Sequence, residues 1–330
     1  MIYIETASED VYYNFACEHY FLHIKKLPEP VFLLWRTSPT LMVGRYQNIA
    51  EEINRTYAEA HSLTLVRRQS GGGTIYTDEG CWQYTYILRD LTADEVDFRK
   101  NSEAVVAALN ELGAKAYFNK RNDVFIGEQK VCGNARYVTD DGIVHHGSIL
   151  FDCDLDAMEA ALTPPEEKII SKGVKSVRQH VSNIHQHLSE DLSPEEFKAR
   201  LLSLIFPGEM PVYEITEEDK REIEKYRREV FASPDFIFGK NPRFEILRKH
   251  RFDGGLLSAN LCVEHGKISA LSFSGDFFFD GDKDALDAYT GCLVGADYTT
   301  EGLSAALTRA AAHGQFFRIT ESDVLSLLLP

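Results

Sequence analysis

The stretch "RRQSGGGTIYTDEG" (residues 67–80) places two arginines and a serine directly before three consecutive glycines. Glycine loses more conformational freedom on folding than any other residue, so three in a row indicate a backbone that must approach another group closely. The amides of such a loop can point at an oxyanion, and arginines bind carboxylate or phosphate through paired hydrogen bonds. The stretch therefore predicts an anion-binding loop; a glycine-rich hairpin with solvated arginines is the alternative.

Two nucleotide-binding motifs are excluded for this loop. No GK[ST] sequence follows the glycines, so the loop is not a P-loop, and it does not match the GxGxxG pattern that opens a helix.

Strand patterns flank the loop on both sides, at 61–69 and at 81–88, where "CWQYTYIL" is aromatic and β-branched. A hairpin is predicted over 129–154, around the Asp-Asp-Gly turn at 140–142. Further predicted strands are 2–5, 30–36, 40–47, 115–118, 123–127, 254–266 and 267–279. Predicted helices are 8–24 with Ser8 as N-cap, 98–112, 155–162, 193–205 with a Ser193–Glu196 capping box, 216–233, 283–293 and 300–312.

This mixed order predicts an α+β fold, with mixed β-sheets flanked by helices and a small α+β accessory domain at the C-terminal end. The Gly-, Asn- and Pro-containing stretch 238–244 is the preferred boundary. We therefore expect a catalytic, ligand-binding domain at 1–240 and an accessory domain at 245–330.

The composition limits the classes of partner. The 330 residues carry a net charge of −16 at pH 7, which argues against binding to nucleic acid or anionic membranes. The first ten residues do not resemble a signal peptide, and no segment has the apolar length of a membrane span. The six cysteines are scattered without a CxxC pair, which is typical of reduced thiols. We expect a cytoplasmic protein.

A second cluster of candidate residues lies at 121–135, "RNDVFIGEQKVCGNA". Lys130 precedes another glycine and could hold a carbonyl or phosphate oxygen as a point charge. Asp123 could hold a magnesium ion among phosphates. The alternative interpretation of Lys130 or Asp123, taken alone, is an ordinary charged residue on the surface.

The paired histidines of "HHGSIL" (145–150) lie on the return strand of the same hairpin. Neighbouring residues of a strand face opposite ways, so at most one of His145 and His146 faces a shared pocket. Metal ligation by both is therefore not expected.

These segments, in this order, resemble the lipoate–protein ligases of the biotin/lipoate ligase superfamily. The matching segments are "LWR" (34–36), "GRYQN" (44–48), "RRQSGGGTIYTDEG" (67–80), "RND" (121–123), "KVCGNA" (130–135), "HHGSIL" (145–150) and "KSVRQHVSN" (175–183). The C-terminal part resembles the small accessory domain of bacterial members.

The resemblance implies a reaction and its participants. Such enzymes use ATP and Mg²⁺ to convert lipoate to lipoyl-AMP with release of pyrophosphate. They then transfer the lipoyl group to a lysine ε-amine of an acceptor lipoyl domain or of the glycine-cleavage H protein. We expect the protein to act as a monomer.

The resemblance also assigns roles to residues. Lys130 would be catalytic, binding the lipoyl carbonyl and the α-phosphate, and Asp123 would bind the metal. The further residues that it implies in binding the substrate or adenylate are Arg45, Arg67, Arg68, Ser70, Gly71, Gly72, Gly73, Thr74, Tyr76, Asn122, Gly133, Asn134, Ala135, His146, Gly147, Lys175 and Arg178.

Two cysteines depart from the commonest family pattern: Cys81 stands where Asn is frequent and Cys132 where Ser is usual. They are either small packing residues or part of the acyl tunnel, where they would alter selectivity. A cysteine-dependent octanoyl or lipoyl transferase, with Cys81, Cys132 or Cys153 as nucleophile, is one alternative function. Biotin ligase and a non-catalytic lipoate-binding protein are the others.

Overall fold

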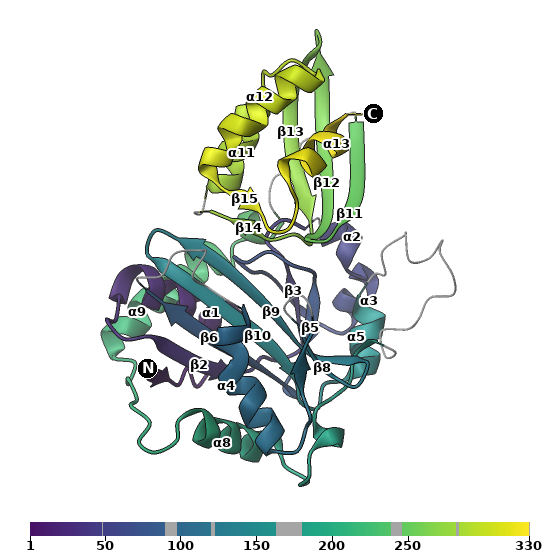
Figure 1. The fold of residues 1–330 in the computed structure, drawn as a ribbon. Coiled ribbons are helices and arrows are strands. Elements are labelled where there is room, and N and C mark those ends of the chain that lie inside the picture. The colour runs from purple at the N-terminus through teal and green to yellow at the C-terminus, as the bar shows by residue number, and fades with distance from the viewer. Residues whose placement is uncertain are drawn as a thin grey trace.

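The computed structural model describes residues 1–47, 49–89, 98–119, 123–162, 180–238, 246–281 and 284–329. Its larger part is built on a seven-stranded mixed sheet, and its smaller part stands on top of it (Figure 1). In spatial order the strands of the large sheet are β1 (Ile2–Ile4), β2 (Val31–Trp35), β6 (Cys81–Leu88), β10 (Gly142–Leu150), β9 (Gln129–Thr139), β8 (Val124–Ile126) and β7 (Tyr117–Phe118). The α+β class and the hairpin predicted over 129–154 are confirmed.

A second sheet of three strands, β4-β3-β5, belongs to the same part of the molecule. Its strands are β3 (Thr40–Val43), β4 (Thr64–Arg67) and β5 (Ile75–Thr77). β4 leads into the glycine-rich loop and β5 leaves it, and both pair with β3. The sequence predicts β2 and β3 as successive strands, and the structure places them in different sheets.

Alternation along β6 assigns its two faces. Trp82, Tyr84 and Tyr86 enter one hydrophobic core, which includes α4 (Phe98–Glu111) and α8 (Pro194–Ile205). Gln83 and Thr85 point to the opposite face, because successive side chains of a strand alternate. Two polar side chains on one face of an otherwise apolar strand indicate that this face has a role besides hydrophobic packing.

Helices cover both faces of the large sheet. The remaining helical elements of this part are α1 (Val11–Tyr20), η1 (Phe21–Lys25), α2 (Ile49–Glu52), α3 (Arg55–Ala60), α5 (Leu155–Ala161), η3 (His185–His187), α9 (Glu217–Tyr226), η4 (Arg227–Phe231) and α10 (Pro234–Phe238). The predicted Ser193–Glu196 capping box is present at α8. The predicted cap of α1 is wrong: Asp10 accepts the amides of Tyr12 and Tyr13, because its carboxylate reaches two free N–H groups.

The C-terminal part has its own hydrophobic core, drawn from residues 246–329 together with the partly buried Tyr46. It comprises β11 (Ile246–Phe252), β12 (Gly255–Glu264), β13 (Lys267–Gly275), β14 (Phe279–Asp280), α11 (Ala285–Leu293), α12 (Thr300–Ala310), η5 (Ala311–His313), β15 (Gln315–Phe316) and α13 (Glu321–Leu328). The sequence predicts β12, β13, α11 and α12, and it misses β11 and α13. The predicted boundary stretch 238–244 begins at the end of α10, and its residues 239–244 lie outside the described residues.

In the described part of the chain, no helix is both long and apolar enough to cross a bilayer.

Candidate active site

A cavity of about 340 Å³ lies where the two sheets and the C-terminal part meet. Its lining includes Ser148 of β10 from the large sheet and Tyr76 of β5 from the small sheet. Arg251 and Phe278 of the C-terminal part complete one side. The lining is mainly apolar with a few convergent polar groups, which is the character of a small-molecule site.

Arg67 is buried and its guanidinium binds main-chain oxygens. Nε donates to the carbonyl of Ile237 at 2.8 Å, and one terminal nitrogen donates to the carbonyls of Gly44 and Gln47 at 2.8 and 2.9 Å. The side chain does not line the cavity. These bonds fasten the start of the glycine loop, and contact of Arg67 with a ligand carboxylate or phosphate stays a prediction.

Arg68 lines the cavity but is engaged in the same way. Its terminal nitrogens donate to the carbonyls of Met42, Gly71 and Gly73 at 2.7–2.9 Å, and Nε donates to Ser70 Oγ at 3.1 Å. Burial lowers the pKa of the Arg68 guanidinium to about 10, so it stays cationic at neutral pH. The three-glycine loop thus closes around a buried cation, and contact of this cation with a ligand phosphate stays a prediction.

A chain of buried polar groups connects the loop to helix α1. His146 Nε2 lies 2.7 Å from Ser70 Oγ, and His146 Nδ1 lies 3.3 Å from Glu18 Oε1. Thr85 Oγ1 donates to the same Glu18 oxygen at 2.6 Å. A carboxylate on one imidazole nitrogen fixes the tautomer and orientation of the ring. Glu18 was missed from the sequence because 128 residues separate it from His146.

His145 faces the other side of the sheet, as strand alternation requires. Its Nε2 lies 3.0 Å from Ser102 Oγ and 3.1 Å from Asn134 Oδ1. Burial lowers the pKa of His145 to about 3, so the ring is neutral. The prediction that at most one of the paired histidines faces the pocket is consistent with this arrangement, in which His146 is that residue.

The structure brings Lys130 and Asp123 together on the lining of the cavity. Lys130 Nζ lies 2.8 Å from Asp123 Oδ1, and the two side chains are 35% and 22% exposed. Gly133 is beside them: a Cβ there would lie 2.9 Å from Lys130 Nζ. An ammonium has three N–H donors, and this ion pair uses one, so the others can meet a ligand oxygen.

Asn134 and Gly147 border the cavity for reasons that the sequence does not reveal. The Asn134 side chain turns to the core under α4, where its Oδ1 accepts the hydroxyl of Tyr84. A Cβ at Gly147 would lie 2.4 Å from the Tyr84 ring. Both residues therefore accommodate Tyr84 behind the sheet, and their contact with a ligand stays a prediction.

The C-terminal part packs directly on the glycine loop. The amide of Gly72 donates to the carbonyl of Phe277 at 3.1 Å, and a Cβ at Gly71 would lie 2.1 Å from that oxygen. Arg136 of β9 and Asp280 of β14 form a largely buried ion pair at 3.0 Å across the same junction. Two of the three glycines thus allow the two parts of the chain to meet.

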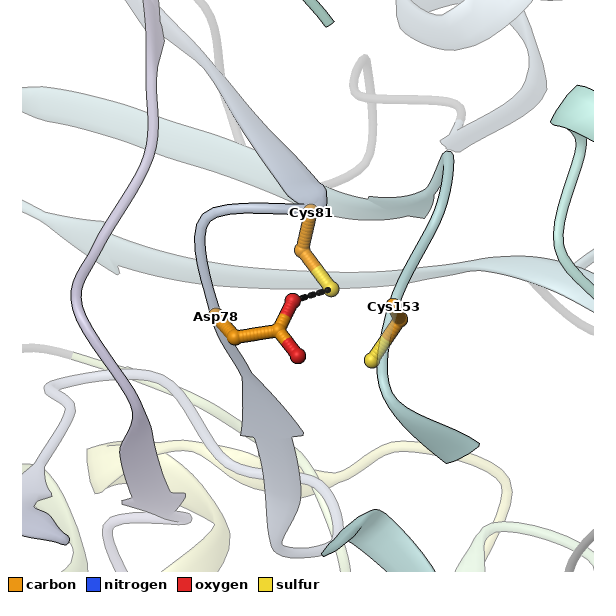
Figure 2. Close-up of side chains that lie close together, drawn as sticks. All are labelled: Asp78, Cys81 and Cys153. Atoms are coloured by element: carbon orange, nitrogen blue, oxygen red, sulfur yellow. Dashed lines mark hydrogen bonds between the residues drawn. The ribbon is translucent and has the colours of Figure 1, made fainter. Parts of the chain in front are cut away.

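Asp78, Cys81 and Cys153 form a buried cluster near the end of β5 (Figure 2). One ligand atom from each lies within 4.8 Å of the others. The Asp78 oxygens already accept the amides of Gly80 and Asp154 at 3.0 and 2.9 Å, and Cys81 Sγ donates to one of them at 3.5 Å. The carboxylate therefore has partners without a cation, and the cluster serves the turn before β6.

The remaining predicted residues fall into three groups. Gly73, Thr74, Tyr76 and Ala135 line the cavity. Arg45 does not, and its guanidinium lies 5.7 Å from the Tyr46 ring centre. Asn122, Lys175 and Arg178 lie outside the described residues.

Comparisons with known proteins cover almost the whole chain. Residues 10–206 match the lipoyl protein ligase A/B catalytic domain, and residues 241–328 match the bacterial lipoate protein ligase C-terminus. Lipoate–protein ligase 1 of Staphylococcus aureus is 38% identical over 88% of this chain and 89% of its own length. Lipoate-protein ligase LplJ of Bacillus subtilis is 34% identical over 99% of this chain and 100% of its own length.

A solved structure shows the same fold over the full length. The crystal structure of P. falciparum LipL1 in complex with lipoate is 21% identical, with a TM-score of 0.81 over 99% of both chains.

Proposed function

Because the chain belongs to the lipoate–protein ligase family, we propose that it converts lipoate and ATP to lipoyl-AMP and transfers the lipoyl group to a lysine of an acceptor domain. The observation that carries this proposal is the pairing of Lys130 with Asp123 on the lining of a mainly apolar cavity. The cavity suits an acyl chain, and the ammonium suits the carboxyl group that the chain ends in.

Lys130 neutralises charge in both half-reactions. In the first, carboxylate and phosphate oxygens come together, and a fixed cation between them lowers the barrier of their approach. In the second, the acyl carbonyl gains negative charge as an amine attacks it, and the same ammonium donates to that oxygen. No covalent bond to the enzyme is needed in either step.

Asp123 fits the role of a magnesium ligand. Mg²⁺ at phosphoryl-transfer sites is usually held by one or two carboxylates together with substrate phosphates. Asp123 offers one partly exposed carboxylate beside Lys130. When bound, the ion would offset the charge of the triphosphate.

The partners and organisation follow from the same premise. We propose an acceptor of the lipoyl-domain or glycine-cleavage H-protein type, a cytoplasmic location and a monomeric enzyme. The family matches at 10–206 and 241–328 support a catalytic domain at 1–240 and an accessory domain at 245–330.

One assay tests the proposed activity. The protein is mixed with lipoate, ATP and Mg²⁺ without an acceptor, and pyrophosphate release and bound lipoyl-AMP are followed by coupled assay and mass spectrometry. Adenylate formation is expected; lipoate binding without any adenylate would leave only a lipoate-binding protein. Mass analysis with a panel of lipoyl domains and an H protein then identifies the acceptor.

Replacing Cys132 by Ala should leave at least about half of the ligase rate. The Cys132 side chain is 1% exposed, and burial raises the pKa of its thiol to about 12, so almost no nucleophilic thiolate is present at neutral pH. A cysteine-dependent transferase would lose all turnover on this change. The initial rate of acceptor lipoylation, compared with that of Cys292→Ala in the accessory domain, decides between them.

A further inference from the structure

Two polar atoms in the cavity wall have no hydrogen-bond partner among the described residues: Gln83 Oε1 and Ser148 Oγ. Both atoms are buried, both residues line the cavity, and they face each other in register on β6 and β10. Buried polar groups almost always have a partner in the protein, in water or in a ligand. Because both residues line the cavity, whatever fills it, water or a ligand, is the available partner of these two atoms.

Strand register places the pair relative to Lys130. Trp35, Gln83, Ser148 and Gly133 form one row across β2, β6, β10 and β9. Gly133 lies beside Lys130 Nζ. Neighbouring strands are about 4.8 Å apart, so Gln83 is two spacings, or roughly 10 Å, from Gly133.

The exposed fraction of the side chains falls along this row from the Lys130 end to Trp35, so the row runs from the mouth of the cavity to its interior. The Lys130 side chain is 35% exposed, Gln83 is 3% exposed and Trp35 is 2% exposed. A ligand whose carboxyl group meets Lys130 therefore extends inward past Ser148 toward Gln83. There the cavity is lined by the buried side chains of Trp35 and Met42.

Gln83 can offer this inner end either a donor or an acceptor. Its Nε2 donates to Thr77 Oγ1 at 2.8 Å. A threonine hydroxyl both accepts and donates, so the amide can turn over and keep this bond. The cavity then receives an N–H group in one orientation and a carbonyl oxygen in the other.

We propose that Gln83 determines acyl specificity by binding the sulfur-bearing end of the substrate, which favours lipoate over an unsubstituted acid of the same chain length. This inference rests on the proposed function, which places the carboxyl group at Lys130. A dithiolane sulfur is a weak acceptor for the amide N–H, and a dithiol donates S–H to the amide oxygen. An octanoyl chain does neither and leaves the buried amide without a partner.

The test compares adenylate formation from lipoate and from octanoate, measured as pyrophosphate release without an acceptor. The wild-type enzyme should have a higher kcat/KM for lipoate, and Gln83→Leu should reduce that preference about 10-fold. Gln83→Met, an unbranched apolar variant, is tested in parallel in case the leucine variant does not fold. Ser148→Ala, one strand nearer to Lys130, should slow both acids equally and leave the ratio unchanged.

Asn260→Leu, on β12 of the accessory domain, is the control for the loss of a strand amide outside the cavity and should leave both rates unchanged. A wild-type ratio near one would overturn the role of Gln83, as would an unchanged ratio in a folded Gln83 variant; both outcomes leave the ligase function intact. Failure of the wild-type protein to form an adenylate from either acid would instead refute the proposed function.

Discussion

Replacing Lys130 by Met should reduce the rate of lipoyl-AMP formation by at least about 100-fold, with little change in stability. The ammonium meets Asp123 at 2.8 Å on the lining of the cavity, beside a glycine that leaves room for it. Methionine keeps the apolar stem but removes the charge that offsets the carboxylate and phosphate oxygens. The loss should appear in kcat, because the charge matters most as those oxygens come together.

The matched control is Lys267→Met. Lys267 forms an ion pair with Asp297 at 2.6 Å on the surface of the accessory domain, where the two side chains are 54% and 62% exposed. Surface pairs of this kind contribute little, so this variant should keep wild-type rates. Single-turnover formation of lipoyl-AMP is measured for both. Full activity of Lys130→Met would remove Lys130 from the site assignment and leave the fold assignment unaffected.

Local patterns predicted most of the fold because they depend on residues close in sequence. The hairpin 129–154 follows from two β-branched runs around Asp-Asp-Gly, and the α8 cap follows from Ser193 and Glu196. β11 was missed because "ILRKHRF" is charged and half-exposed at the edge of its sheet. Charged edge strands lack the apolar alternation on which the prediction depends.

The candidate site was predicted less completely, because residue type does not reveal a side chain's partner. A buried arginine can bind backbone carbonyls as well as phosphates, so the sequence could not show that Arg67 and Arg68 hold the glycine loop itself. Gly147 lines the cavity, but the sequence could not show that the Tyr84 ring behind the sheet is what excludes a Cβ there. Gln83 is a polar residue in an aromatic strand, and this pattern is the sequence signal for its place in the cavity wall.

The contacts that the accessory domain makes with the glycine loop and with β9 could not be predicted from its sequence. Phe277 contacts the glycine loop through its carbonyl oxygen, and any residue has such an oxygen. The Arg136–Asp280 pair joins positions 144 residues apart. Only the docking of two separate hydrophobic cores creates these contacts.

Replacing Arg68 by Leu should disorder the glycine loop and reduce kcat/KM for adenylate formation by about 100-fold. The guanidinium donates to the carbonyls of Met42, Gly71 and Gly73 and to Ser70 Oγ. Leucine leaves these buried acceptors without a donor, and each orphaned acceptor costs about 1–3 kcal/mol unless the loop opens to water. Opening would also release His146 from its contact with Ser70.

Hydrogen exchange distinguishes this effect from general unfolding. Amides of residues 68–77 should exchange faster in Arg68→Leu, while those of β12 and β13 should keep wild-type protection because their core is separate. Arg200→Leu is the control: its guanidinium pairs with Glu190 on the surface at 3.0 Å, so the change should cost under about 1 kcal/mol. Wild-type exchange in the loop of Arg68→Leu would mean that the glycines hold their conformation without the buried cation. In the wild-type protein, Arg68 would then have to act on the ligand itself, as the sequence predicts.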